Sequence, residues 1–116
     1  MSQLDGSPVE MDVVLYEEDG IWIAQGLQFD VTARGESPTQ ASDRFDAKVG
    51  AELIMSLELQ DESPLSAIGQ APEKFWSMFK NAKITVKKEE TFIRIMEGRG
   101  TTRVHSRIKI SGKEAA

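Results

Sequence analysis

The 116-residue chain contains no cysteine and a single histidine, His105. It can therefore form neither a disulfide framework nor a thiolate metal site, and it has no histidine cluster for a transition metal. A run of about 18 apolar residues, which a membrane-spanning helix needs, is also missing. The start, MSQLDGSPVE, has neither the basic head nor the apolar stretch of a secretory signal. We expect a cytoplasmic protein that does not enter a membrane.

Basic residues are scarce in the first part of the chain and common in the last. Residues 1–73 carry three Lys or Arg against fifteen Asp or Glu, a net charge of −12, whereas residues 74–116 carry eleven against four, a net charge of +7. An acidic surface suits a basic protein partner, and a basic surface suits phosphate. The two parts can equally attract each other within the fold, so the asymmetry leaves both interpretations open.

The first third of the chain predicts three strands. Apolar and polar residues alternate from Met11 to Tyr16, and in the turn EEDG that follows, Asp19 and Gly20 can supply the positive φ angles of a tight hairpin. The next run, IWIAQG, is apolar on both faces, as in a central strand. Residues 29–34 alternate again. We expect an antiparallel three-stranded sheet.

A helix is predicted to begin after this sheet. Ser37 is suited to be its N-cap, Pro38 its first residue, and Gln40 can exchange hydrogen bonds with the cap. Apolar residues recur every four positions from Ala41 to Leu53, so this stripe should pack on the sheet. Beyond Val49 the helix is apolar almost all round, which predicts burial under later segments or against a second subunit. We expect a homodimer, and a helix end between residues 54 and 60.

The remainder reads as a loop, a short helix and strands. Residues 61–72 have the composition of a connecting loop, and Pro72 opens a short helix that contains Phe75 and Phe79. Strands are then predicted at residues 83–88, 91–96 and 104–110, the first two joined by a turn at Glu89–Glu90 and the last two by a glycine-bearing loop. The whole, residues 1–116, is interpreted as one α+β domain.

The order of three strands and a helix, with an acidic Asp-Gly turn in the first hairpin, resembles the N-terminal domain of the HicB antitoxin family. The resemblance covers residues 11–57, and we assign residues 11–60 to a HicB-like core and residues 73–112 to a helix with basic β segments. The positions that match the family pattern are Asp19, Gly20, Trp22, Ala24, Gly35, Ser37 and Ala41.

The resemblance implies a partly degraded ribonuclease H-like fold, a β-β-β-α core without catalytic carboxylates, that binds and blocks a small basic ribonuclease toxin. The sequence departs from the family in three ways. GLQFD stands where the family has Leu-Pro-Gly, Gln40 replaces the usual Glu before Ala41, and the C-terminal part reads as a helix plus strands instead of a DNA-binding helical module.

A catalytic or metal site is not expected. Asp12, Asp30 and Asp43 could form a carboxylate set for Mg²⁺, but Asp12 and Asp30 lie among polar-face residues, where solvated acids normally occur. His105 has no serine or carboxylate at a diagnostic spacing. We predict a protein without a cofactor that acts by binding.

A basic row in the last part of the chain is the candidate for contact with nucleic acid. The residues are Arg99, Arg103, Arg107 and Lys109. Arg107 and Lys109 would share one face of a strand, with Arg103 in phase, and such a row could contact phosphates. No aromatic residues interleave with it, as stacking on single strands would require. A regulatory module that binds nucleic acid or protein through this segment is therefore the alternative function, and it is not favoured.

For a protein partner, the candidate residues are Glu17, Glu18 and Asp19 in the first turn, together with Trp22 and Trp76. The three acids would be exposed to a basic partner. Trp22 follows the turn on a strand with two apolar faces, which favours packing over presentation. Trp76 is one step round the short helix from Phe75 and Phe79, so it is either a core residue or an interface anchor.

Overall fold

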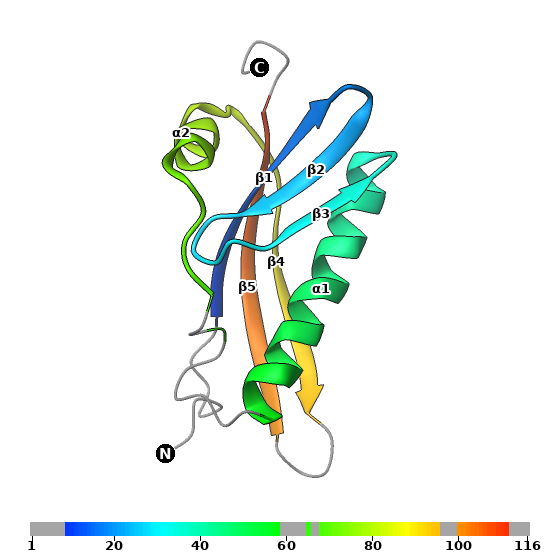
Figure 1. Cartoon of the computed structure of the whole chain (residues 1–116), viewed down its shortest axis with the longest axis vertical. Coiled ribbons are helices and arrows are strands. Elements are labelled where there is room, and N and C mark those ends of the chain that lie inside the picture. Colours follow the sequence, from blue (N-terminus) through cyan, green and yellow to red (C-terminus); the bar gives the residue numbers. More distant parts are fainter. Residues whose placement is uncertain (1–8, 59–64, 66–67, 96–99, 112–116) are drawn as a thin grey trace.

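The computed structural model of the chain describes residues 9–58, 65, 68–95 and 100–111, which form five strands and two helices (Figure 1). In chain order these elements are β1 (Val9–Glu18), β2 (Ile21–Gly26), β3 (Thr32–Gly35), α1 (Pro38–Glu58), α2 (Glu73–Asn81), β4 (Ile84–Ile95) and β5 (Gly100–Ile110). The α+β class predicted from the sequence is confirmed.

All five strands belong to one mixed sheet with the order β3-β2-β1-β5-β4. β1 lies in the middle because it is apolar on both faces: Val13, Val14 and Leu15 are consecutive and all buried. β1 pairs with β2 on one side and with β5 on the other. The β1–β5 pair is parallel, and the other neighbouring pairs are antiparallel. The predicted three-stranded antiparallel sheet is therefore wrong, because the late strands join the same sheet through β5.

The first hairpin has the predicted turn. Asp19 and Gly20 connect β1 to β2 with φ angles of 54° and 81°, as a two-residue turn with positive φ at both positions requires. β2 is paired on both sides, as its two apolar faces predicted. β3 begins at Thr32, later than predicted, because the chain first makes a tight bend in which the Gly26 N–H donates to the Val31 carbonyl at 2.9 Å.

α1 begins where the sequence predicts. The Gln40 N–H donates to Ser37 Oγ at 3.1 Å, while the Gln40 side chain accepts from the N–H of Glu36, one residue before the cap. Ala41, Phe45, Val49 and Leu53 form the predicted buried stripe against the sheet. The start of α1 approaches β3 so closely that a Cβ on Gly35 would lie 2.5 Å from the Ala41 nitrogen.

The two helices cover opposite faces of the sheet (Figure 1). Side chains of β1 alternate between them: Met11, Val13 and Leu15 pack with the α1 stripe, and Val14 packs with Phe79 of α2. Period-2 alternation on a central strand thus produces two separate apolar clusters. α2 follows Pro72 as predicted.

The predicted turn at Glu89–Glu90 is wrong, because both residues lie within β4. The strand is continuous from Ile84 to Ile95, and Glu89 and Glu90 are paired with Ser106 and His105 of β5. Two glutamates supply neither a positive φ nor a fixed φ, so nothing in them stops a strand. Residues 96–99, between β4 and β5, lie outside the described part. Residues 100–103, predicted as loop, belong to β5.

Within the described residues, neither helix combines the length and the apolar character needed to cross a membrane.

Candidate binding surfaces

The tip of the first hairpin carries three consecutive exposed acids, Glu17, Glu18 and Asp19. They are exposed because the turn projects beyond the ends of the neighbouring strands. Ile21, the first residue after the turn, also keeps 37% of its surface exposed. Trp22 lies opposite Glu17 in the ladder, half-buried against the α1 cluster. The tip therefore combines three negative charges with one exposed aliphatic side chain, while Trp22 contributes mainly to packing.

On the other face of β1, Tyr16 lies under α2. Its ring centroid is 5.8 Å from that of Phe75, with a tilt of 31°. Burial raises the pKa of the Tyr16 hydroxyl, the charge of Glu18 raises it further, and Arg34 acts in the opposite direction. Tyr16 is thus an anchor of the α2 cluster beside the acidic tip.

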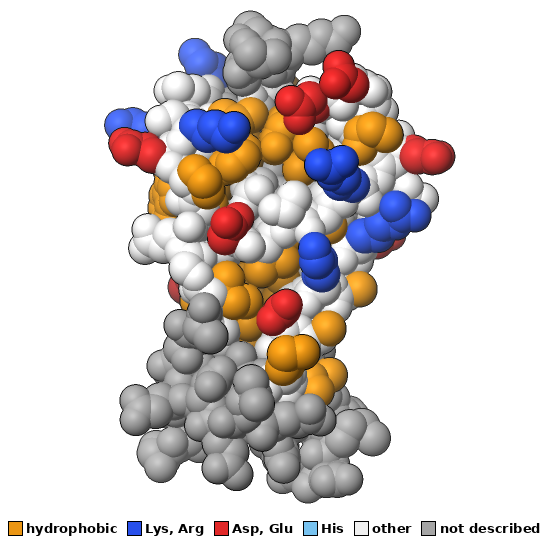
Figure 2. All heavy atoms as spheres, viewed as in Figure 1, with side chains coloured by type: hydrophobic (Ala, Val, Ile, Leu, Met, Phe, Trp, Pro, Cys, Tyr) orange, Lys and Arg blue, Asp and Glu red, His pale blue; other side chains and the backbone are white. Residues whose placement is uncertain are grey.

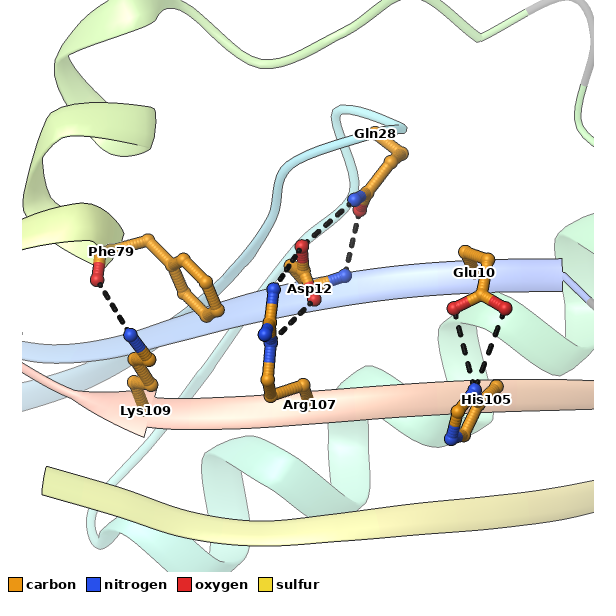
Figure 3. A network of polar contacts seen from close by, with 7 residues as sticks. All are labelled: Glu10, Asp12, Gln28, Phe79, His105, Arg107 and Lys109. Carbon is orange, nitrogen blue, oxygen red and sulfur yellow. Dashed lines mark hydrogen bonds and ion pairs between the residues drawn. The ribbon is translucent and has the colours of Figure 1, made fainter.

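Polar side chains form a ladder across the parallel strands β1 and β5 (Figure 3). Asp12 accepts two hydrogen bonds from Arg107, at 3.2 and 3.3 Å, and His105 Nδ1 lies 3.4 Å from a carboxylate oxygen of Glu10. Gln28 completes the arrangement: its amide donates to Asp12 at 3.0 Å and its oxygen accepts from the Asp12 N–H at 2.7 Å. With Ser106, these residues line a hollow of about 370 Å³.

The basic row is partly engaged inside the molecule. Arg107 and Lys109 share one face of β5, as predicted, and both lie near the ring of Phe79, at 5.2 and 4.6 Å from its centroid (Figure 3). Lys109 also donates to the Phe79 carbonyl at 3.5 Å, and Arg107 is paired with Asp12. These contacts compete with phosphate for both cations. Arg99 and the side chain of Arg103 lie outside the described residues.

The three aspartates considered for a metal site have different surroundings. Asp12 faces Arg107 and Gln28, Asp30 accepts from Gln25 Nε2 at 2.7 Å, and Asp43 is exposed on α1. Among the residues whose positions are described, no group of three or more His, Asp or Glu side chains could hold a metal ion.

Trp76 packs within the α2 cluster, where it is half-buried. Its indole N–H donates to the Ala71 carbonyl at 3.2 Å, which fixes the ring across the segment that precedes α2. A buried indole N–H with a partner is typical of a packed tryptophan. Its predicted role as an interface anchor stays a prediction.

A basic groove beside β3 was not found from the sequence. It has a volume of about 460 Å³ and is lined by Thr32, Ala33, Arg34, Arg44 and Lys48. Figure 2 shows basic side chains gathered over β3 and α1. The available signal was that these three cations are the only Lys or Arg residues in the first 73 positions. The polar ladder was missed for another reason, since it depends on a register between residues about 95 positions apart.

Comparison with protein-family models, with curated proteins and with solved structures gives no match for this chain.

Proposed function

We propose that the protein is a HicB-like antitoxin-type binding protein that acts in the cytoplasm without catalysis and inhibits a small basic ribonuclease toxin. The observation that carries the proposal is the exposed acidic tip of the first hairpin, Glu17 to Asp19. Acidic groups around an exposed aliphatic side chain, here Ile21, are a suitable contact for a basic protein, because charge steers the encounter and apolar burial holds the complex.

The order of the elements also supports the proposal. The resemblance to the family rests on a turn, a second strand and a glycine before a capped helix. In the chain these are Asp19-Gly20, β2, Gly35 and Ser37. Each of these residues has a physical task in a β-β-β-α unit: positive φ in the turn, close approach at Gly35 and capping at Ser37.

The non-catalytic part of the proposal is supported by the state of the carboxylates. Asp12 is neutralised by Arg107, and Asp30 accepts a hydrogen bond from the buried Gln25. Two-metal hydrolysis instead requires carboxylates that converge on a pair of metal ions about 4 Å apart.

The test uses a purified small basic protein encoded by a reading frame next to that of this chain. We expect it to form a complex whose association slows with added salt, and we expect its ribonuclease activity to be blocked. Glu17→Lys with Glu18→Lys should weaken the complex by about tenfold or more, because two favourable charges become repulsive. Asp19 is left unchanged to preserve the turn.

The matched control is Asp43→Lys with Glu73→Lys, which makes the same change in net charge at two exposed positions on α1 and α2. An equal loss of affinity in both variants would show only a general effect of charge and would remove the hairpin tip as the contact. Absence of any complex with such a neighbour would overturn the antitoxin proposal.

A further inference from the structure

The outer edge of β3 has no partner strand among the described residues. β3 is an edge strand: it pairs with β2 on one side, and no strand of the described chain pairs with its other side, beside which α1 lies (Figure 1). Because the N–H and C=O of one strand residue point to the same side, both groups of Thr32 and of Arg34 point outward. The two carbonyls accept hydrogen bonds from α1: Lys48 Nζ donates to Thr32 at 2.6 Å and Arg44 Nη1 to Arg34 at 3.1 Å.

The charge at this edge differs from that of its surroundings. Residues 1–73 contain fifteen acids and only three Lys or Arg, and all three, Arg34, Arg44 and Lys48, line the groove at this edge. All three are exposed. The hydrogen bonds of Arg44 and Lys48 to β3 go to neutral carbonyls, so these contacts leave the positive charge of both side chains uncompensated.

We propose that this edge is a docking site for an acidic peptide segment in extended conformation, which adds a strand beside β3. The segment would pair with the outward groups of Thr32 and Arg34, as in other cases of strand addition. Arg44 and Lys48 would exchange the carbonyls for carboxylates of the segment, which form stronger, charge-assisted hydrogen bonds.

The spacing of Arg44 and Lys48 predicts the spacing of the acidic residues in the peptide segment. Arg44 and Lys48 are four residues apart on α1, which is a rise of about 6 Å along a helix. Carboxylates two residues apart on a strand are separated by about 6.7 Å and point to the same face. A Glu-x-Glu sequence therefore fits the pair, one carboxylate to each cation.

A peptide fits this edge better than nucleic acid does. A phosphate backbone accepts hydrogen bonds but donates none, so the carbonyls of Thr32 and Arg34 would stay without new donors. A second copy of this chain is also a poor occupant, because edge-to-edge pairing would bring Arg34, Arg44 and Lys48 against the same cations. The acidic hairpin tip is not extended, since Asp19 and Gly20 have positive φ.

The proposal is tested with a short synthetic peptide of Thr and Val that carries Glu-x-Glu, titrated into the full chain. We expect the backbone amide signals of Thr32 and Arg34 to shift and their hydrogen exchange to slow. Arg44→Gln with Lys48→Gln should weaken binding by about tenfold, since glutamine keeps a donor for the carbonyls but loses the charge. Lys80→Gln with Lys83→Gln makes the same charge change at exposed positions elsewhere and should have little effect.

Three further probes separate strand addition from general attraction. A peptide N-methylated at alternate residues keeps its carboxylates but cannot form the ladder, and it should not bind. A Lys-x-Lys peptide should not bind either. A short single-stranded DNA is the third probe. Binding of the methylated peptide, tighter binding of the DNA, equal binding by the Gln variant or no binding by the unaltered chain would each overturn the proposal. The probe contains no basic residue, so the outcome is independent of the function proposed above.

Discussion

Asp12 and Arg107 lie 95 positions apart in the sequence and face each other across β1 and β5, joined by hydrogen bonds of 3.2 and 3.3 Å. The first residue belongs to the acidic part of the chain and the second to the basic part. Part of the charge asymmetry is therefore satisfied inside the fold, at the parallel pairing that completes the sheet. The acids of the hairpin tip and the cations beside β3 stand outside this ladder.

A double-mutant cycle should show that this pair contributes modestly to stability. For Asp12→Asn and Arg107→Gln we expect a coupling free energy of about 1 kcal/mol or less, because the two side chains keep 20% and 47% of their surface exposed. The comparison is the cycle Glu10→Gln and His105→Gln, whose side chains are 64% and 50% exposed, and we expect a smaller value there. Urea denaturation measures both, and a larger coupling for Glu10 and His105 would contradict the ranking.

Two glycines should respond differently to substitution. Gly20 has φ of 81° and open space around its missing Cβ, so Gly20→Ala should cost about 1 to 2 kcal/mol through backbone strain alone. A Cβ at Gly35 would lie 2.5 Å from the Ala41 nitrogen, so Gly35→Ala should cost about 3 kcal/mol or more because α1 must shift away from β3.

Asparagine separates these two causes. Asn tolerates positive φ better than alanine does, so Gly20→Asn should recover part of the stability lost in Gly20→Ala. Gly35→Asn should recover nothing, because its Cβ meets the same backbone atoms. Thermal unfolding of the four variants measures this. A recovery at Gly35, or none at Gly20, would show that the causes have been assigned incorrectly.

The correct predictions concern features that are set by residues close together in the chain. The turn at Asp19-Gly20, the cap at Ser37 and the stripe from Ala41 to Leu53 follow from local rules of φ angles, capping and periodicity. The parallel pairing of β1 with β5 joins residues about 95 positions apart, and no local pattern contains that register. The three-stranded sheet was predicted for this reason.

The same distinction applies to the two candidate binding surfaces. The acids of the turn could be identified because a tight hairpin projects its own side chains. The groove beside β3 could not, since it forms only when α1 brings Arg44 and Lys48 against the carbonyls of Arg34 and Thr32. The spacing of four residues between Arg44 and Lys48 is compatible with a shared helix face, but it does not contain the strand edge that this face meets.

The C-terminal half of α1 should mediate self-association. Val49 and Leu53 face the sheet, while Ile54 and Met55 keep 44% and 54% of their surface exposed. Apolar side chains on this outer side suit a second copy of the chain. We expect light scattering at micromolar concentration to give a homodimer, and Ile54→Glu with Met55→Glu to give a folded monomer. A monomer without substitution would remove the predicted dimer, and a dimer that survives both substitutions would move it to another surface.

Tyr16 should make the stability of the protein fall at alkaline pH. Its pKa in the folded chain is raised above its ordinary value of 10.0, first by burial under α2 and then by Glu18, against the smaller opposite effect of Arg34. Between the two pKa values the folded state holds a proton that the unfolded state has lost. The stabilisation is therefore complete below pH 10.0 and is lost as the pH rises through the folded pKa.

The measurement compares the unaltered chain with Tyr16→Phe in urea at pH 8 and pH 11. Phenylalanine keeps the ring contact with Phe75 but does not titrate. The lysines also titrate in this pH range, but they do so in both proteins, so the difference between the two proteins reports on Tyr16 alone. We expect the difference in unfolding free energy to move in favour of the variant as the pH rises. Since Glu18 acts in the same direction as burial, Glu18→Gln should reduce the movement. A difference that stays constant, or that moves in favour of the unaltered chain, would show that the folded state does not hold the Tyr16 proton more tightly than the unfolded chain does.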